Sequence, residues 1–355
     1  MKRYFVSVVA VAVLLSLALP AAAQGLQNVE LHGYLENRFY ANPNTSARFI
    51  AFRISLSAVA QVGKDGTAYT EVYFHPNTNS SVYLESAYLD LPLSEGRIRI
   101  GKGRQLNFGL TPAYGNRKLI QYGILAETFT MDRIQGFQYA YKKGAFDFGA
   151  SLFTDLRVGQ RLAGNFPGGG AVTVPYFADR DIVGSASGEL AGSVKVGVTT
   201  PCFQAHVSGQ TGGLRQNDAD FIGWPYGFAP GANTNRDHNQ YGVDATYTSG
   251  PFIAQGEWYQ GNFSFLKVSG FSILAGYQPK DKTRAYVRYA ALDNNRAVVP
   301  AQPLTWDKQQ LTFGVVQPIR EGVWVEFQYE KNWESTGGAP NVNNDLLFVE
   351  FFTGF

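Results

Sequence analysis

Apolar and polar residues alternate along many short stretches of this chain, and turn-favouring residues separate the stretches. In one of the clearest, Val325 and Phe327 alternate with Glu326 and Gln328. A period of two is typical of a β-strand whose two faces meet different surroundings. Sixteen candidate strands follow from this pattern, at 28–40, 47–62, 67–76, 82–92, 96–104, 132–142, 145–154, 190–200, 203–210, 240–248, 252–261, 266–279, 282–291, 309–318, 321–331 and 345–355.

The connections between these strands alternate in length. Every second connection is tight and rich in turn residues, at 63–66, 93–96, 142–144, 200–202, 249–251, 279–281 and 319–321. The others are mostly longer, above all 105–131, 155–189 and 211–239. Short turns at one rim and long loops at the other indicate a transmembrane barrel. We therefore predict an all-β fold, a transmembrane antiparallel β-barrel of about sixteen strands with short periplasmic turns and long extracellular loops.

The strand count stays open at two places. The stretch 118–131 contains Leu119, Ile120, Tyr122 and Phe129, and its content resembles that of a strand. The stretch 171–179 has the same character. Counts of fourteen or eighteen strands are therefore alternatives to sixteen.

The first 23 residues have the pattern of a secretory signal peptide. Lys2 and Arg3 precede an apolar run, and the small residues 21–23 predict cleavage before Gln24. No later segment reaches the roughly 18 uninterrupted apolar residues of a spanning helix. We expect an exported chain with a single barrel domain at 24–355.

The last strand is apolar and ends on an aromatic residue. Leu347, Val349, Phe351 and Phe355 share one face, and Glu350 lies on the other. Such a strand would be an aggregation-prone edge unless it closes a barrel. It resembles the C-terminal strand of bacterial outer-membrane barrels, whose final Phe belongs to the assembly signal. The resemblance implies a bacterial outer-membrane location, with membrane lipid as a partner.

Composition and motifs narrow the function. The chain has 30 basic and 28 acidic residues, and removal of Lys2 and Arg3 leaves 28 of each, so nothing indicates nucleic acid binding. The four histidines, at 32, 75, 206 and 238, are isolated, and no H-E-x-x-H or G-x-S-x-G motif occurs. We therefore expect no enzyme activity, no metal site and no cofactor.

The segment 105–131 resembles the third loop of general porins, which folds into the lumen and narrows it. The strand 96–104 and the residues around it, 82–112, are similar to the family that includes the phosphate- and polyphosphate-selective porins. These resemblances imply a trimeric porin through which small hydrophilic solutes or ions diffuse passively. Only Arg117 and Lys118 are basic between 105 and 131, so the phosphate specificity of that family is not implied.

Strand parity predicts which charged side chains face the lumen, because a charge facing lipid would cost about 2–4 kcal/mol. Lys195, Glu36, Glu257 and Glu350 fall on inward faces. The residues that we expect to line the pore or its constriction are Arg53, Arg97, Arg99, Arg104, Arg117, Lys118, Glu127, Arg133, Arg284, Arg288 and Glu326. The basic residues among them would give an anion preference, unless these charged groups only pair with one another.

Other readings remain. A plugged barrel could serve as a receptor, an adhesin or a sheath for a redox partner. A barrel enzyme would need a Ser/His/Asp cluster, which isolated histidines do not favour. Tyr34, Tyr69, Tyr73 and Trp324 could line a sugar path, although the aromatic belts at the membrane interfaces are the commoner place for such residues.

Overall fold

The computed structural model describes residues 26–42, 45–74, 82–110, 118–130, 133–154, 157–162, 173–178, 190–295, 303–335 and 343–355. The predicted signal peptide, Arg117 and His75 lie outside these residues. The strands are β1 (Leu26–Asn42), β2 (Thr45–Val62), β3 (Gly66–Phe74), β4 (Val82–Leu93), β5 (Gly96–Arg104), β6 (Arg133–Lys143), β7 (Phe146–Thr154), β8 (Arg157–Leu162), β9 (Thr173–Ala178), β10 (Leu190–Thr199), β11 (Phe203–Gly213), β12 (Asp237–Ser249), β13 (Phe252–Phe263), β14 (Leu266–Tyr277), β15 (Arg284–Asn294), β16 (Asp307–Arg320), β17 (Val323–Ser335) and β18 (Leu346–Gly354). The helices are α2 (Ile124–Phe129), α3 (Gln216–Gly223) and the 3₁₀ helices η2 (Trp224–Tyr226) and η3 (Pro303–Thr305).

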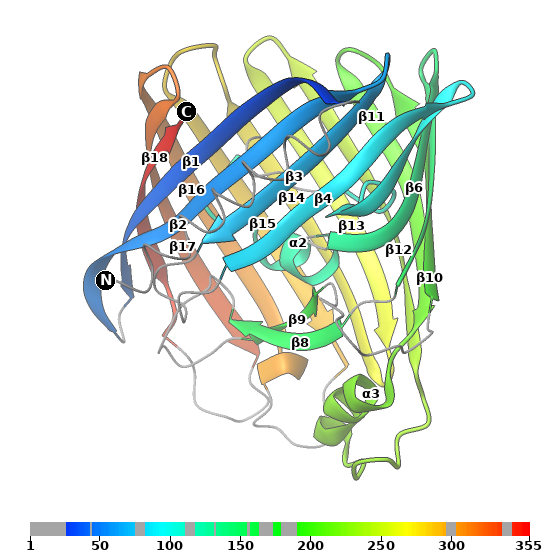
Figure 1. The fold of residues 1–355 in the computed structure, drawn as a ribbon. Helices are drawn as coiled ribbons and strands as arrows, with labels where there is room; N and C mark the ends of the chain where they lie inside the picture. Colours follow the sequence, from blue (N-terminus) through cyan, green and yellow to red (C-terminus); the bar gives the residue numbers. More distant parts are fainter. Residues whose placement is uncertain are drawn as a thin grey trace, which may run out of the picture.

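Within the described residues, sixteen strands form one closed antiparallel barrel (Figure 1). Each strand pairs with its neighbour in the chain, except that β7 pairs with β10 and the first strand pairs with the last. Strands β8 and β9 pair only with each other. The closure of β1 on β18 leaves the barrel wall without a free edge, as a bilayer requires.

The sixteen predicted strands correspond to the sixteen strands of the barrel. The largest difference at an end is in β17, which was expected to end at 331 and extends to Ser335. The two ambiguous stretches add no strand to the wall. Residues 124–129 form the helix α2, and residues 173–178 form β9 of the separate hairpin. The count of sixteen is therefore confirmed.

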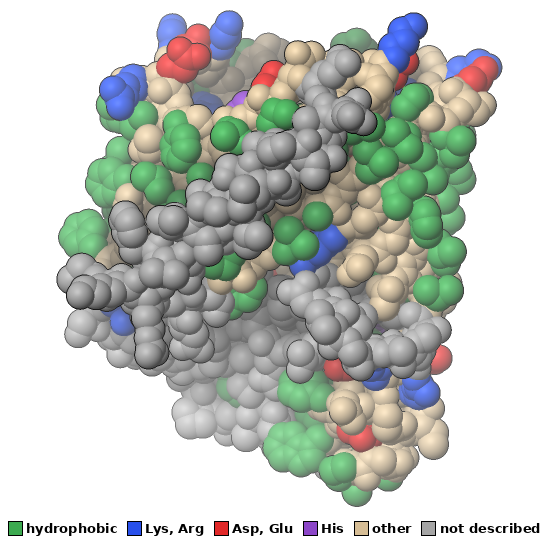
Figure 2. All heavy atoms as spheres, viewed as in Figure 1, with side chains coloured by type: hydrophobic (Ala, Val, Ile, Leu, Met, Phe, Trp, Pro, Cys, Tyr) green, Lys and Arg blue, Asp and Glu red, His purple; other side chains and the backbone are tan. Residues whose placement is uncertain are grey.

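The outer face of the barrel is apolar. Alternate side chains of each strand are exposed there, and the large ones include Leu31, Phe49, Val207, Ile273 and Phe313. Figure 2 shows hydrophobic side chains over the wall and charged ones gathered at the short-turn rim. Within the described residues, no helix has the length and apolar character needed to cross a membrane. The outer face of the strands provides the surface that contacts lipid.

The short turns lie at one rim of the barrel. Strand β1 begins at this rim, and strand β18 ends there. Leu26 is paired with Val62, beside the first turn, and Phe355 exchanges two backbone hydrogen bonds with Gly33 at 2.8 and 2.9 Å. Exposed aromatic side chains encircle part of this rim, at Phe146, Phe203, Tyr247, Phe252 and Tyr277. Such a belt is typical of the membrane–water interface. Helix α3 projects at the opposite rim (Figure 1).

The contact between the terminal Phe355 and Gly33 yields the first prediction. A Cβ atom at residue 33 would lie 2.5 Å from Cζ of Phe355 and 2.8 Å from the backbone oxygen of Ser55. We expect Gly33→Ala to destabilise the closing seam by about 1–3 kcal/mol, because the Phe355 ring and the backbone at Ser55 would both have to move. Heat-dependent gel mobility of the folded barrel measures this loss.

Gly256→Ala is the matched control, since a Cβ atom there has no neighbour within 4 Å. Equal unfolding temperatures of the two variants would contradict the role given to the Gly33–Phe355 contact.

Candidate pore-lining site

The segment between β5 and β6 crosses the lumen. In the closed strand order, β15 and β16 lie half-way round the barrel from β5 and β6, from which the segment starts and to which it returns. Its described residues nevertheless bond to Arg288 on β15 and to Gln328 on β17. Figure 1 shows α2 inside the barrel. The segment is therefore held by walls on both sides of the lumen.

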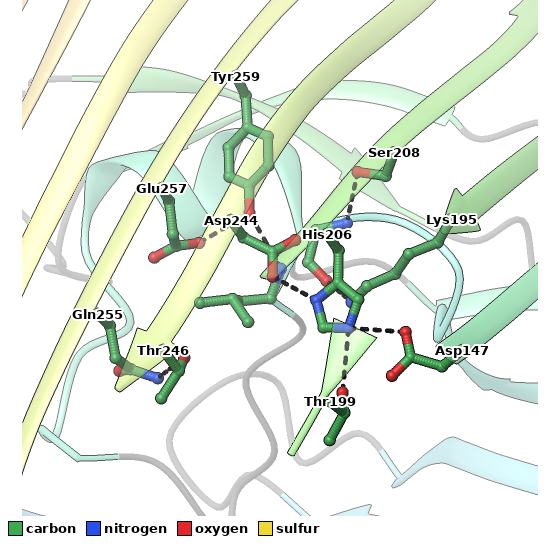
Figure 3. Close-up of polar contacts among 12 residues, drawn as sticks. Asp147, Lys195, Thr199, His206, Ser208, Asp244, Thr246, Gln255, Glu257 and Tyr259 are labelled. Carbon is green, nitrogen blue, oxygen red and sulfur yellow. Dashed lines mark hydrogen bonds and ion pairs between the residues drawn. The ribbon is translucent and has the colours of Figure 1, made fainter. Parts of the chain in front are cut away.

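The first anchor holds the start of the segment against β10, β11 and β13 (Figure 3). Nζ of Lys195 donates a hydrogen bond to the carbonyl oxygen of Gly109 at 2.6 Å, and the Gly109 N–H donates to Oγ of Ser208 at 3.0 Å. The Leu110 N–H donates to the hydroxyl of Tyr259, also at 3.0 Å. Three side chains from three strands thus fix two consecutive peptide groups.

The second anchor is Arg288 on the far wall. Its Nη1 donates to the carbonyl oxygens of Gln121 at 3.0 Å and Tyr122 at 2.7 Å. Its Nη2 lies 3.9 Å from Oε1 of Glu330, and Glu127 of α2 also acts on it electrostatically. All three charged groups are buried. Arg288, Glu127 and Glu330 thus form one charged cluster around the bend that precedes α2.

Apolar contacts complete the attachment of the segment. The Leu119 side chain occupies the position that a Cβ atom at residue 314 of β16 would take. Because residue 314 is a glycine, the inner wall has room for Leu119. Phe129 packs on Tyr259 and Phe263, with ring centroids 5.5 and 6.1 Å apart. All six side chains of α2 are buried. A helix this short depends on such packing, because its few internal hydrogen bonds cannot stabilise it alone.

A group of arginines and glutamates lies on the inner face of β1, β2 and β18. Arg38 lies 2.5 Å from Glu350 and 3.5 Å from Glu36, and Arg53 lies 3.9 Å from Glu36. Glu326 is buried and is the register partner of Glu350. The predicted residues Arg53 and Glu326 thus face inward, and the partner that sequence reasoning missed is Arg38.

Two other predicted arginines contact one carboxylate, that of Glu85 near the beginning of β4. Arg104 of β5 lies 3.9 Å from Glu85, and Arg133 of β6 also contacts that carboxylate. Both arginines are mostly buried inside the wall. Lys118 is half-buried in the crossing segment, where burial and the nearby Arg284 lower its pKa below the usual value.

Arg97 and Arg99 lie nearer the short-turn rim than the crossing segment does. Arg99 makes two hydrogen bonds of 2.9 Å to Asp90 and lies over the ring of Tyr88, 3.8 Å from its centroid. Arg97 is exposed and bonds to backbone oxygens of Asp65 and Asp90. Arg97 thus lies in the first strand positions after the turn, away from the place expected for a constriction.

One histidine proves not to be isolated. Nδ1 of His206 lies 2.9 Å from Oδ1 of Asp244, and its Nε2 lies 3.1 Å from Oδ1 of Asp147 (Figure 3). Asp147 and His206 both pair with Gly197, and Asp244 pairs with Glu257, so one register level of β7 and β10–β13 carries all these groups. The turn at 200–202 and strand parity are the signals that could have revealed this row.

Nε2 of His206 also lies 3.5 Å from Oγ1 of Thr199, but the carboxylate of Asp147 lies nearer to that nitrogen, at 3.1 Å, unlike the arrangement of a hydrolytic triad. Each ring nitrogen of His206 faces a carboxylate oxygen, Asp244 on one side and Asp147 on the other. A general base needs one ring nitrogen directed at the nucleophile. Within the described residues, no group of three or more His, Cys, Asp or Glu residues could hold a metal ion.

The aromatic residues that could have lined a sugar path face the lumen but pack on one another. The Trp324 ring stacks on Phe352 with the ring centroids 3.9 Å apart, and Phe352 stacks on Tyr34 with the centroids 5.2 Å apart. Tyr69 and Tyr88 stack at 5.0 Å. Their ring faces are therefore largely occupied, and these residues stiffen the wall.

Comparisons with known proteins agree with the fold. The family model described as phosphate-selective porin O and P matches residues 225–303. No curated protein matches the chain. The matched family consists of porins, which are channels and not enzymes, in agreement with the prediction of a non-enzymatic protein.

Several solved structures cover nearly the whole chain. The outer membrane channel DcaP of Acinetobacter baumannii is 13% identical, with 94% of this chain and 98% of that chain covered and a TM-score of 0.65. An anion-selective porin from Comamonas acidovorans is 14% identical, with 92% and 99% covered and a TM-score of 0.57. The trimer form of OmpT, an outer membrane protein of Vibrio cholerae, is 14% identical, with 92% and 99% covered and a TM-score of 0.58.

Removal of the Arg288 anchor tests how the crossing segment is held. We expect Arg288→Met to expose the segment, because two charge-assisted hydrogen bonds to its backbone are lost. Trypsin should then cut after Arg117 or Lys118 faster than in the unchanged protein, as measured by mass spectrometry. Arg97→Met is the control, since it removes the same charge at the short-turn rim, away from the segment; equal cleavage of both variants would contradict the anchor.

Gly197 makes room for the His206 ring, which gives a further prediction. A Cβ atom at 197 would lie 2.6 Å from Cδ2 of His206 and would also meet the backbone of Ala205. We expect Gly197→Ala to shift the ¹⁵N signals of labelled His206 and to lower stability by about 1–3 kcal/mol. Gly192→Ala on the same strand, with its nearest neighbour at 3.5 Å, should leave both unchanged. An unchanged His206 signal in Gly197→Ala would refute this packing.

Three features define the architecture: a closed wall with an apolar outer face, short turns at one rim, and a segment that crosses a polar lumen. The structural matches share the barrel fold over nearly their full length. The chain therefore has the sixteen-stranded barrel fold of the bacterial outer-membrane porins.

Proposed function

We propose that the protein is a bacterial outer-membrane porin through which small hydrophilic solutes diffuse passively. One observation carries this proposal: the segment after β5 crosses the lumen and leaves an open cavity of about 390 Å³ between itself and the strands β11–β15. Polar side chains from both the segment and the wall line this cavity. In a plugged barrel, we would expect the plug to fill such a water-accessible space.

Selection by size would take place at the segment 105–131. Its anchors at Lys195, Tyr259 and Arg288 lie on different parts of the wall, so the segment cannot swing as a free flap. A rigid constriction discriminates by width, because a solute must pass without displacing it.

The ion pairs bear on charge selection. Six of the inward arginines lie within 3.9 Å of a carboxylate oxygen, namely Arg38, Arg53, Arg99, Arg104, Arg133 and Arg288. Paired charges largely cancel beyond a few ångströms in water-filled surroundings. We therefore propose a weak ion preference. The preference for anions that the arginines alone would produce is reduced by their partners.

A homotrimer in the outer membrane is part of the proposal. The trimer form of OmpT has the same barrel fold over 92% of this chain. The apolar outer wall would provide both the lipid contact and the subunit contact.

Single-channel recording in a planar lipid bilayer tests the function. We expect steady open steps, since the crossing segment is anchored, and a reversal potential close to zero in a KCl gradient, since the charges are paired. A folded barrel that never conducts would support the plugged receptor or adhesin instead. Strong anion selectivity would show that the arginines act despite their partners.

A further inference from the structure

The cavity beneath the crossing segment has a composition that suits one class of solute. One side of the cavity is formed by residues of the segment, namely Leu110, Lys118, Gln121 and Tyr122. Its walls come from β11 to β15, and they reach the short-turn rim at Gln204, Thr248 and Gln278. A solute that passes the segment would enter this space before it leaves the barrel.

Amide and hydroxyl side chains dominate the polar wall, and neighbours orient several of them. Nε2 of Gln255 donates to Oγ1 of Thr246 at 3.2 Å (Figure 3). This bond orients the Gln255 amide so that its carbonyl oxygen can accept a hydrogen bond from another group. The Tyr286 hydroxyl donates to Oε1 of Gln278 at 3.3 Å, which occupies the acceptor of that amide and leaves its donors. The wall thus offers both donors and acceptors in prepared orientations.

Glu257 adds a strong acceptor to this wall. Its Oε2 accepts a hydrogen bond from the Tyr259 hydroxyl at 3.0 Å, and its side chain is only partly exposed in the cavity. Within the described residues, Glu257 forms no ion pair. Its second oxygen is suited to accept a hydrogen bond from a hydroxyl donor.

An apolar patch lies beside the polar groups. Leu119, Ile253 and Leu274 are buried and belong to one hydrophobic cluster, and all three line the cavity. A solute with hydroxyl groups on its edges and C–H groups on its face could use both surfaces at once.

The charges of the cavity nearly balance. Lys118 and Glu257 contribute one basic and one acidic group. Arg288 also lines the cavity, but its guanidinium bonds to the segment backbone and lies beside Glu330. A simple anion would meet Glu257 and a simple cation would meet Lys118, so neither matches the whole site.

We propose that this cavity is a binding site for neutral polyhydroxylated solutes of monosaccharide to disaccharide size. The volume of about 390 Å³ falls within the range of small-molecule pockets, which starts at about 300 Å³. This inference rests on the proposed diffusion function and specifies one class of solute for it. Binding in the path would hold such a solute transiently while it crosses.

The test measures the ion current through single channels while maltose is added on the short-turn side. We expect brief closures whose frequency saturates with maltose concentration. A polyethylene glycol of the same hydrodynamic size is the control, and it should lower the conductance without saturable closures. Maltose that acts only as the polymer does would overturn the inference, and saturable block by glycylglycine without block by maltose would assign the site to zwitterions instead.

Variants locate the site. Gln255→Leu should raise the half-blocking maltose concentration by about two- to tenfold, because one neutral hydrogen bond to the solute is lost. Gln61→Leu, on β2 near the same rim but outside the cavity, should leave it unchanged. Equal block in both variants would overturn the location. Channels that conduct without maltose block would refute this inference alone, whereas folded barrels without conductance would refute the proposed function.

Discussion

The closure of the backbone hydrogen-bond ladder is the constraint on which the rest of this structure depends. In a bilayer, a peptide group without a partner costs several kcal/mol, so the first strand must meet the last. Here β1 pairs with β18 over eight register positions, from Tyr34 with Gly354 to Ala41 with Leu347. Once the sheet is closed, strand parity assigns each side chain to lipid or to the lumen. Within the membrane span, the charged groups then have only the interior available.

The closed wall also positions the interior groups with respect to one another. Residues from five strands share one register level, which brings Asp147, His206 and Asp244 together although they are far apart in the chain. Glycines adapt this inner surface to its contents: Gly197 admits the His206 ring, and Gly314 admits Leu119 of the crossing segment. The rigid wall therefore determines where the segment can rest, and the segment in turn determines the cavity beneath it.

The sequence predicted what depends on local periodicity and missed what depends on register. The strands and the inward face of Glu350 were predictable, because a period of two is visible in any ten-residue window. Its partner Arg38 lies 312 positions away in the chain and could not be deduced from parity alone. The stretch 124–129 was ambiguous because all six side chains of α2 are buried, which removes the helical period from the sequence. His206 was judged isolated for a related reason, since its partners come from β7 and β12.

The described residues of the segment between β5 and β6 cross the lumen and rest on the opposite wall. The most direct measurement is disulfide formation between Leu119→Cys and Gly314→Cys, with Cys202→Ser to remove the native thiol. The Leu119 side chain lies where a Cβ atom at 314 would point, and a disulfide needs Cβ atoms about 4 Å apart. We predict rapid oxidation to an intramolecular disulfide in the folded barrel, detected by mass spectrometry. A folded barrel whose two thiols stay reduced under the same oxidant would contradict the crossing.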